Sequence, residues 1–185
     1  EEDEEVDLPV GHGDPGLLGL LGHGEGVLQL KTPTRLPSLL GGERAVGVAA
    51  SGLFSLALSA NGALWSWGGG GDGKLGHGDE EDQWQPKKIE AFAGQRVVAV
   101  SAGDSHSLAL TADGALWSWG RGDDGRLGHG NQRNQLLPKK AEALAGQRIV
   151  AVSAGGMHSL ALTADGARWS WGGGSFGKLG HGDQQ

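Results

Sequence analysis

Residues 108–130 read LALTADGALWSWGRGDDGRLGHG, and nearly the same stretch stands before and after them in the chain. Residues 56–78 read LALSANGALWSWGGGGDGKLGHG, and residues 160–182 read LALTADGARWSWGGGSFGKLGHG. The second and third copies agree at 18 of 23 positions, and each copy begins 52 residues after the copy before it. A fixed period of this length indicates a repeat architecture in which each copy forms one structural unit.

Each unit is predicted to consist of short strands separated by turns that contain glycine. Residues 97–100 are an apolar, β-branched run, and residues 108–110 lead through Asp113-Gly114 into residues 115–119. Asp-Gly between two such runs predicts a β-hairpin with a type I′ turn, in which both central residues have positive φ. A fourth, polar strand begins at Pro86. No segment has apolar residues at helical spacing over ten or more positions, so we expect the chain to be nearly all β.

Four short strands in each 52-residue unit are typical of a β-propeller blade. In Trp-Ser-Trp the two indoles share one face of the strand and the serine lies on the other. Because one blade cannot bury both faces of its sheet, neighbouring blades must stack. We therefore predict an all-β, partial propeller arc of about three to three and a half four-stranded blades. The tryptophans are expected to fill the space that glycine and alanine leave between blades.

The sequence divides into a tail, a repeat remnant and three repeats. Residues 1–8 are predicted to be an acidic disordered tail, and residues 9–32 a degenerate repeat remnant, because LGHG already stands at 21–24. Residues 33–185 are predicted to form three propeller repeats, which span about 33–85, 86–137 and 138–185. In the first repeat, Ser51 and Phe54 stand where the second repeat has Gly103 and His106. Such departures are common in the terminal units of repeat proteins, so the first repeat is predicted to be a terminal unit.

Composition excludes several classes of protein. Glycine accounts for 37 of 185 residues without the every-third-residue period of collagen, and no apolar stretch is long enough to predict membrane insertion. Without cysteine the chain has no disulfide, thiolate zinc site or cysteine nucleophile.

The first residues, EEDEEVD, do not resemble a signal peptide, so we expect an intracellular protein, cytoplasmic or nuclear. The net charge is −7, but six acids lie in this tail and the remainder is nearly neutral, so no nucleic-acid partner is expected.

Motifs that suggest chemistry have a better structural explanation. GGGGDGK at 68–74 lacks the Ser or Thr and the helix that follow in a phosphate-binding P-loop. His77, His129 and His181 recur once per unit, too far apart to share a metal, and are interpreted as structural hydrogen-bonding groups. His106 and His158 are expected to bond neighbouring backbone. We expect no catalytic, cofactor-binding or metal-binding residue and no enzymatic activity in this chain.

Three residues are candidates for contact with a protein partner: Trp84, Arg121 and Arg133. Trp84 falls outside the repeated pattern, in the stretch EEDQWQ at 80–85, which is predicted to be a variable loop. Loops on a rigid scaffold often carry function, and Trp and Arg are favoured interface anchors. The alternative for Trp84 is local packing against its own blade.

Two stretches together, WSWGRGDDGRLGHG and VSAGDSHSLALTADG, resemble the repeats of the regulator of chromosome condensation family. The resemblance covers residues 33–185. Family members usually form a closed seven-bladed ring, so the resemblance implies that further blades are needed from a parent chain or another subunit. This chain is therefore expected to be a piece of a longer protein, or part of a larger assembly.

The resemblance implies a non-catalytic protein–protein interaction or scaffold module, as in the repeat domains of HECT-type ubiquitin ligases. One alternative is guanine-nucleotide exchange on a Ran-type small GTPase, the activity of the founding member. A second alternative is ultraviolet-B reception, as in the plant receptor of the family. That receptor's sensing indoles match Asp104 and Gly156 here, which argues against this alternative.

Overall fold

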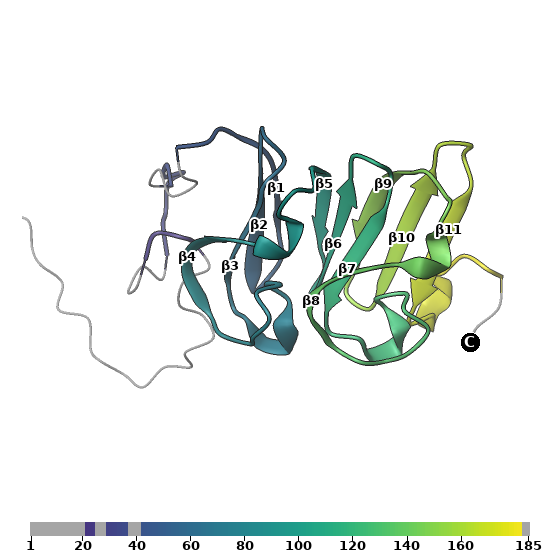
Figure 1. The fold of residues 1–185 in the computed structure, drawn as a ribbon. Helices are drawn as coiled ribbons and strands as arrows, with labels where there is room; N and C mark the ends of the chain where they lie inside the picture. The colour runs from purple at the N-terminus through teal and green to yellow at the C-terminus, as the bar shows by residue number, and fades with distance from the viewer. Residues whose placement is uncertain (1–20, 25–28, 37–41, 183–185) are drawn as a thin grey trace, which may run out of the picture.

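The structure is a computed structural model that describes residues 21–24, 29–36 and 42–182. Three antiparallel sheets follow one another along the chain and stand side by side in the same order (Figure 1). The first sheet consists of β1 (Ala45–Ala50), β2 (Phe54–Ser59), β3 (Leu64–Gly68) and β4 (Gln83–Lys88). The second consists of β5 (Val97–Ala102), β6 (His106–Thr111), β7 (Leu116–Gly120) and β8 (Gln135–Lys140). The third consists of β9 (Ile149–Ala154), β10 (His158–Thr163) and β11 (Arg168–Gly172).

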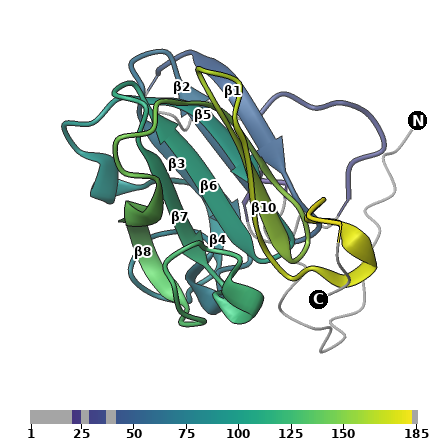
Figure 2. The ribbon, with the colours of Figure 1, turned by 90° about the vertical axis from the view of Figure 1, so that its right-hand side faces the viewer.

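Within each sheet the strands lie in chain order, as expected for a propeller blade. The sheets stack face to face (Figure 2): β5 lies against β1 and β2, and β9 lies against β5 and β6. The predicted all-β, partial propeller arc is therefore confirmed. Residues 86–88 and 138–140 complete β4 and β8 of the preceding sheet, so the sheets and the sequence units are out of phase by a few residues. The predicted acidic tail, 1–8, lies outside the described residues.

Short 3₁₀ turns complete the described secondary structure. They are η2 (Gly71–Gly73), η3 (Glu90–Phe92), η4 (Asp123–Gly125), η5 (Glu142–Leu144) and η6 (Ser175–Gly177). Three of them, η2, η4 and η6, follow the third strand of a sheet, and the other two link one sheet to the next.

The predicted hairpins form, but their turn type was predicted wrongly. Gly114 has φ of +83°, whereas Asp113 is not among the described residues with positive φ. The Gly114 N–H donates to the Thr111 carbonyl across a four-residue turn, and the Asp113 carboxylate accepts from the Ala115 N–H. This is the pattern of a type I turn followed by a left-handed glycine, in which the aspartate caps the turn with its side chain.

The apolar core lies between the sheets. Leu56, Leu58 and Leu64 of the first sheet pack with Val97 and Trp119 of the second. The equivalent leucines of the second sheet face the third in the same way. The Trp119 indole is completely buried and meets the Phe92 ring edge-on at 5.8 Å between centroids. The indoles therefore fill the space between blades, as predicted.

Glycine is required where a loop passes over an indole. A Cβ on Gly76 would lie 2.8 Å from Trp119 Nε1, and a Cβ on Gly128 would lie 3.0 Å from Trp171 Nε1. Both glycines also have positive φ. The Gly-His-Gly segment therefore lets the loop of one blade lie directly on the tryptophan of the next.

Residues 21–24 repeat this contact at the start of the described chain. A Cβ on Gly22 would lie 2.9 Å from Trp67 Nε1. The Gly24 N–H donates to the Trp84 carbonyl at 3.2 Å, as the Gly78 N–H donates to the Leu136 carbonyl at 2.9 Å. This LGHG segment thus occupies the place that the loop of a preceding blade takes on the second and third sheets. The full extent of the predicted remnant, 9–32, stays a prediction.

Candidate interaction surface

The loops that join the third and fourth strands lie at one end of the first two sheets, along the lower edge in Figure 1. We call residues 69–82 and 121–134 the loop rim. In both loops a backbone N–H after the third strand donates to a side chain just before the fourth. The Gly70 N–H donates to Asp82 Oδ1 at 2.8 Å, and the Gly122 N–H donates to Asn134 Oδ1 at 2.9 Å. The two loops therefore share one frame.

Each loop of the rim is also tied to the next sheet. The Lys74 carbonyl accepts hydrogen bonds from Trp119 Nε1 at 2.9 Å and from Ser107 Oγ at 2.8 Å. The Arg126 carbonyl accepts the equivalent pair of bonds from the third sheet. Lys74 and Arg126 are almost fully buried, and the Arg126 guanidinium also reaches the Gly156 carbonyl at 2.9 Å. These bonds hold the rim rigidly on the stacked sheets.

His106 makes a contact that the sequence did not predict. Its Nε2 lies 2.9 Å from Ser159 Oγ of the next sheet, and both side chains are completely buried. The Ser159 hydroxyl proton is donated to the Arg126 carbonyl, so His106 Nε2 must be the donor of this bond. The expectation that His106 bonds neighbouring backbone through its side chain is wrong, because the ring points across the interface between sheets.

The His106–Ser159 pair is unsuited to nucleophilic catalysis. A nucleophilic serine needs its hydroxyl proton accepted by a base, whereas here the proton is committed to a carbonyl and the histidine donates. Burial, together with the charge of Arg126, lowers the pKa of His106 to about 4. The neutral imidazole is therefore a structural link between two blades.

Replacement Ser159→Ala tests this link. It leaves the buried His106 Nε2–H without an acceptor and removes the bond from the Ser159 hydroxyl to the Arg126 carbonyl, so we expect the free energy of unfolding to fall by about 1–2 kcal/mol. Denaturant unfolding at pH 7 measures the change, and Ser175→Ala, at an exposed position of the third sheet's loop, is the matched control. Equal stability of the two variants would contradict the proposed link.

The recurring histidines His77, His129 and His181 are hydrogen-bonded within their own blades, as predicted. His77 Nε2 lies 2.9 Å from Ser66 Oγ, and His129 and His181 lie 3.0 Å from the equivalent serines. Burial is the main cause that lowers the pKa of His77 to about 4, assisted by the charge of Lys87, and burial also lowers that of His129. Within the described residues, no three His, Asp or Glu side chains lie close enough to hold a metal ion. No helix in the described residues is long and apolar enough to cross a membrane.

The structure places Arg121 and Arg133 together on the loop rim. Gly122 lies against the backbone of Arg133, since a Cβ on this glycine would be 2.1 Å from the Arg133 carbonyl oxygen. Both arginines are exposed, and Arg121 forms an ion pair with Asp123 at 2.6 Å. The hydrogen bond that Arg121 Nε donates to Asp123, together with the charge of the aspartate, raises the pKa of that guanidinium.

Trp84 lies elsewhere, and its predicted setting was wrong. It belongs to β4, an edge strand, rather than to a loop, and its carbonyl accepts from Gly24. Its side chain is partly buried, so local packing and partner contact are both compatible with its position. No described contact brings Trp84 to the two arginines.

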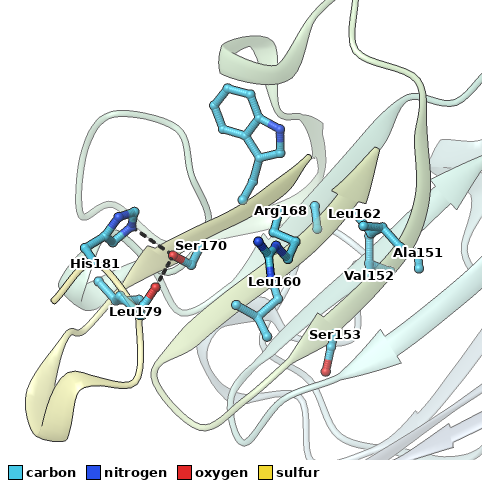
Figure 3. A pocket seen from close by; sticks show the side chains of 12 residues that line it. Ala151, Val152, Ser153, Leu160, Leu162, Arg168, Ser170, Leu179 and His181 are labelled. Atoms are coloured by element: carbon cyan, nitrogen blue, oxygen red, sulfur yellow. Dashed lines mark hydrogen bonds between the residues drawn. The ribbon is translucent and has the colours of Figure 1, made fainter. Parts of the chain in front are cut away.

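The sequence predicts that an open arc leaves its end faces bare, but it did not indicate which residues of the third sheet would be exposed there. Leu160 and Leu162 (Figure 3) and Trp169 are about two-fifths exposed there, and Phe176 is fully exposed. Phe176 stands where the other loops have Asp72 and Asp124, and it shares their positive φ, at +62°. The replacement of the repeated aspartate by Phe176 is the feature of the sequence that could have indicated an exposed aromatic side chain here.

The comparisons with known proteins agree with the fold. The family described as Regulator of chromosome condensation (RCC1) repeat matches residues 61–110 and 113–162, and a second family of the same description matches residues 97–126 and 149–178. The crystal structure of Prp20p from Saccharomyces cerevisiae is 30% identical, with a TM-score of 0.78, over 91% of this chain and 42% of that one. That structure was described together with the binding properties of Prp20p to Gsp1p and histones.

Two curated relatives cover most of the chain. The human E3 ubiquitin-protein ligase HERC2 is 44% identical over 89% of this chain, and the Arabidopsis thaliana Ultraviolet-B receptor UVR8 is 42% identical over 90% of it. The chain spans only 3% of the length of HERC2 and 38% of that of UVR8. The similarity therefore concerns the repeats and not the whole of either relative.

Proposed function

This chain belongs to the regulator of chromosome condensation repeat family, and from that premise we propose that it is a non-catalytic interaction module that binds protein partners through the loop rim. One observation carries the proposal: the two loops of the rim share one rigid frame but differ in chemistry at equivalent positions. Arg121 stands where the first loop has Gly69, and Arg133 stands where it has Glu81. A rigid loop backbone that carries different charges at equivalent positions is suited to the recognition of a partner rather than to catalysis.

The proposed contact residues are Arg121 and Arg133 on the loop rim and, separately from them, Trp84 on β4. Arginine anchors at an interface bind carboxylates with paired hydrogen bonds, so an acidic group of the partner is expected at Arg133, whereas Arg121 already pairs with Asp123 of its own loop. Trp84 offers a large, partly exposed indole on the outer edge of the first sheet. Truncation of such an anchor typically costs about 2 kcal/mol, which is roughly a 30-fold loss of affinity.

Affinity capture with matched variants tests the proposal. We expect partners captured by the unmodified chain to be lost with Arg121→Glu/Arg133→Glu, and weakened with Trp84→Ala. Arg148→Glu is the control, since Arg148 is exposed but lies beside Gly114 at the opposite end of β7. Equal capture by all four proteins would contradict the assignment of these residues, and capture of no protein would contradict the function.

Nucleotide exchange on a small GTPase is a second candidate, supported by the similarity to Prp20p, whose binding to Gsp1p has been described. Exchange requires only that the module bind the nucleotide-free GTPase more tightly than the loaded one. Release of a fluorescent guanine nucleotide from a Ran-type GTPase is the measurement. Faster release with the unmodified chain than with Arg121→Glu/Arg133→Glu would support exchange through the rim.

A further inference from the structure

Two equivalent cavities lie at the end of the sheets opposite the loop rim. The first, of about 270 Å³, lies between the hairpin turn of the first sheet, the end of β4 and the segment that leads into β5. The second, of about 210 Å³, lies at the same place between the second and third sheets. We call them the first and the second turn cavity. Each is formed by one sheet and the segment that joins it to the next.

An arginine is held at each turn cavity by the glycine of the hairpin. A Cβ on Gly62 would lie 3.0 Å from Arg96 Cα, and a Cβ on Gly114 would lie 3.4 Å from Arg148 Cα. The Gly62 carbonyl also accepts from the Val97 N–H at 3.1 Å, and the equivalent bond at the second cavity is 3.2 Å long. The backbone of both arginines is therefore fixed on the turn, while their side chains are exposed.

The first turn cavity combines buried apolar side chains with exposed cations. Ile89 and Phe92 line it and are almost fully buried, and Lys88 and Arg96 line it from exposed positions. In the part of the chain that the structure describes, both ion pairs belong to the second loop of the rim, so neither Lys88 nor Arg96 has an acidic partner. An anion in this cavity would meet two cations whose charge no described side chain neutralises.

The second turn cavity contains a carboxylate of its own. Asp113 lines it beside Lys140. The hydrogen bond from Thr111 is the main cause that lowers the pKa of Asp113, assisted by the Ala115 N–H and by the charge of Lys140. The carboxylate is therefore ionised at neutral pH and offsets part of the positive charge there.

An asparagine takes the place of this carboxylate in the first turn cavity. Asn61 Oδ1 accepts from the Ala63 N–H at 3.0 Å, which is the bond that Asp113 makes in the second hairpin. Asn61 Nδ2 donates to Glu43, which does not line the cavity. Glu90 and its equivalent in the next unit line neither cavity. The two cavities thus share one frame and differ by one negative charge.

We propose that the first turn cavity binds a phosphate group. A phosphate monoester carries about two negative charges at neutral pH and has three strong acceptor oxygens. The Arg96 guanidinium can bind two of these oxygens with paired hydrogen bonds, and the Lys88 ammonium can bind the third. A carboxylate has a single charge and would leave one of the two cations without a partner. The site lies at the opposite end of β3 from the loop rim, so it is separate from the proposed partner contacts.

Titration of the isotope-labelled chain with inorganic phosphate, followed by NMR, tests the proposal. We expect saturable shifts of the Gly94 and Gln95 amide signals, with a dissociation constant in the millimolar range. Arg96→Gln and Lys88→Gln should each weaken binding by about tenfold or more. Arg148→Gln, the same change at the second turn cavity, is the matched control and should bind normally. Sodium chloride at equal ionic strength corrects for screening.

Exchange of one charge between the two cavities is the sharper test. Asp113→Asn removes the carboxylate of the second turn cavity and should give that cavity phosphate binding comparable to that of the first. Asn61→Asp/Glu43→Gln moves a carboxylate into the first turn cavity at constant net charge and should weaken binding by about tenfold or more. Both hairpins can accept either residue, because Asn61 and Asp113 cap their turns with the same bond.

Three results would overturn the proposal: shifts that do not saturate, shifts that persist in Arg96→Gln, and no gain of binding in Asp113→Asn when circular dichroism shows that it is folded. A peptide with one phosphoserine, compared with its unphosphorylated form, identifies the source of the phosphate. Tighter binding than that of inorganic phosphate indicates a phosphorylated partner, and equal binding indicates a free phosphate compound. Arg121→Glu/Arg133→Glu should leave phosphate binding unchanged, so this inference and the proposed function can fail separately.

Discussion

Replacement Trp119→Ala is expected to lower the free energy of unfolding by about 3–5 kcal/mol. The indole is completely buried between the first two sheets and packs edge-on against Phe92. Its Nε1–H is also the donor that ties the Lys74 carbonyl to the second sheet. The truncation therefore opens a cavity and removes one of the bonds that hold the loop rim. Denaturant unfolding, followed by circular dichroism, measures the loss.

Trp169→Ala is the matched control, because it deletes the same atoms at a position that is 40% exposed. We expect this variant to lose less than about 1 kcal/mol, because its indole is already partly exposed to solvent. A loss for Trp119→Ala no larger than that of the control would show that the space between the blades does not depend on the indole. In that case the main physical argument for the stacked arc would be wrong.

The repeat predicted the fold well because the relevant signals are local. Strand length, the Asp-Gly hairpins and the Trp-Ser-Trp alternation depend on residues next to one another in the chain. The turn type was wrong because the Asp113 side chain bonds the Ala115 N–H, which keeps φ of the aspartate negative and leaves the left-handed position to glycine. A side-chain cap of this kind competes with the backbone preference of the dipeptide.

The site was harder to predict because its contacts join residues far apart in sequence. His106 and Ser159 are 53 positions apart and meet only when two sheets stack. Trp84 was placed in a loop because it interrupts the repeat, yet β4 accommodates it as an edge strand. A repeated sequence identifies the frame, whereas the contacts across blades depend on the stacking geometry.

The stability of the folded chain is expected to fall as the pH falls below 6.5. Burial lowers the pKa of His106 to about 4 in the folded chain, below the ordinary value of 6.5. Above pH 6.5 both folded and unfolded chains carry a neutral imidazole. Between pH 6.5 and 4 the unfolded chain binds a proton that folded His106 does not, so stability falls as the pH falls. The loss from this one group is about 3 kcal/mol over that window.

Replacement His106→Phe isolates this contribution, because the first sheet already has Phe54, completely buried, at the equivalent position. Other titrating groups, including His77, affect both proteins alike and cancel in the comparison. We expect the difference in free energy of unfolding between the two proteins to change by up to about 1.4 kcal/mol per pH unit below 6.5, in favour of the phenylalanine variant. Parallel stability curves from pH 7 to 4.5 would mean that the folded chain protonates His106 as readily as the unfolded one. The imidazole could not then be the buried, neutral donor that links Ser159 to the preceding blade.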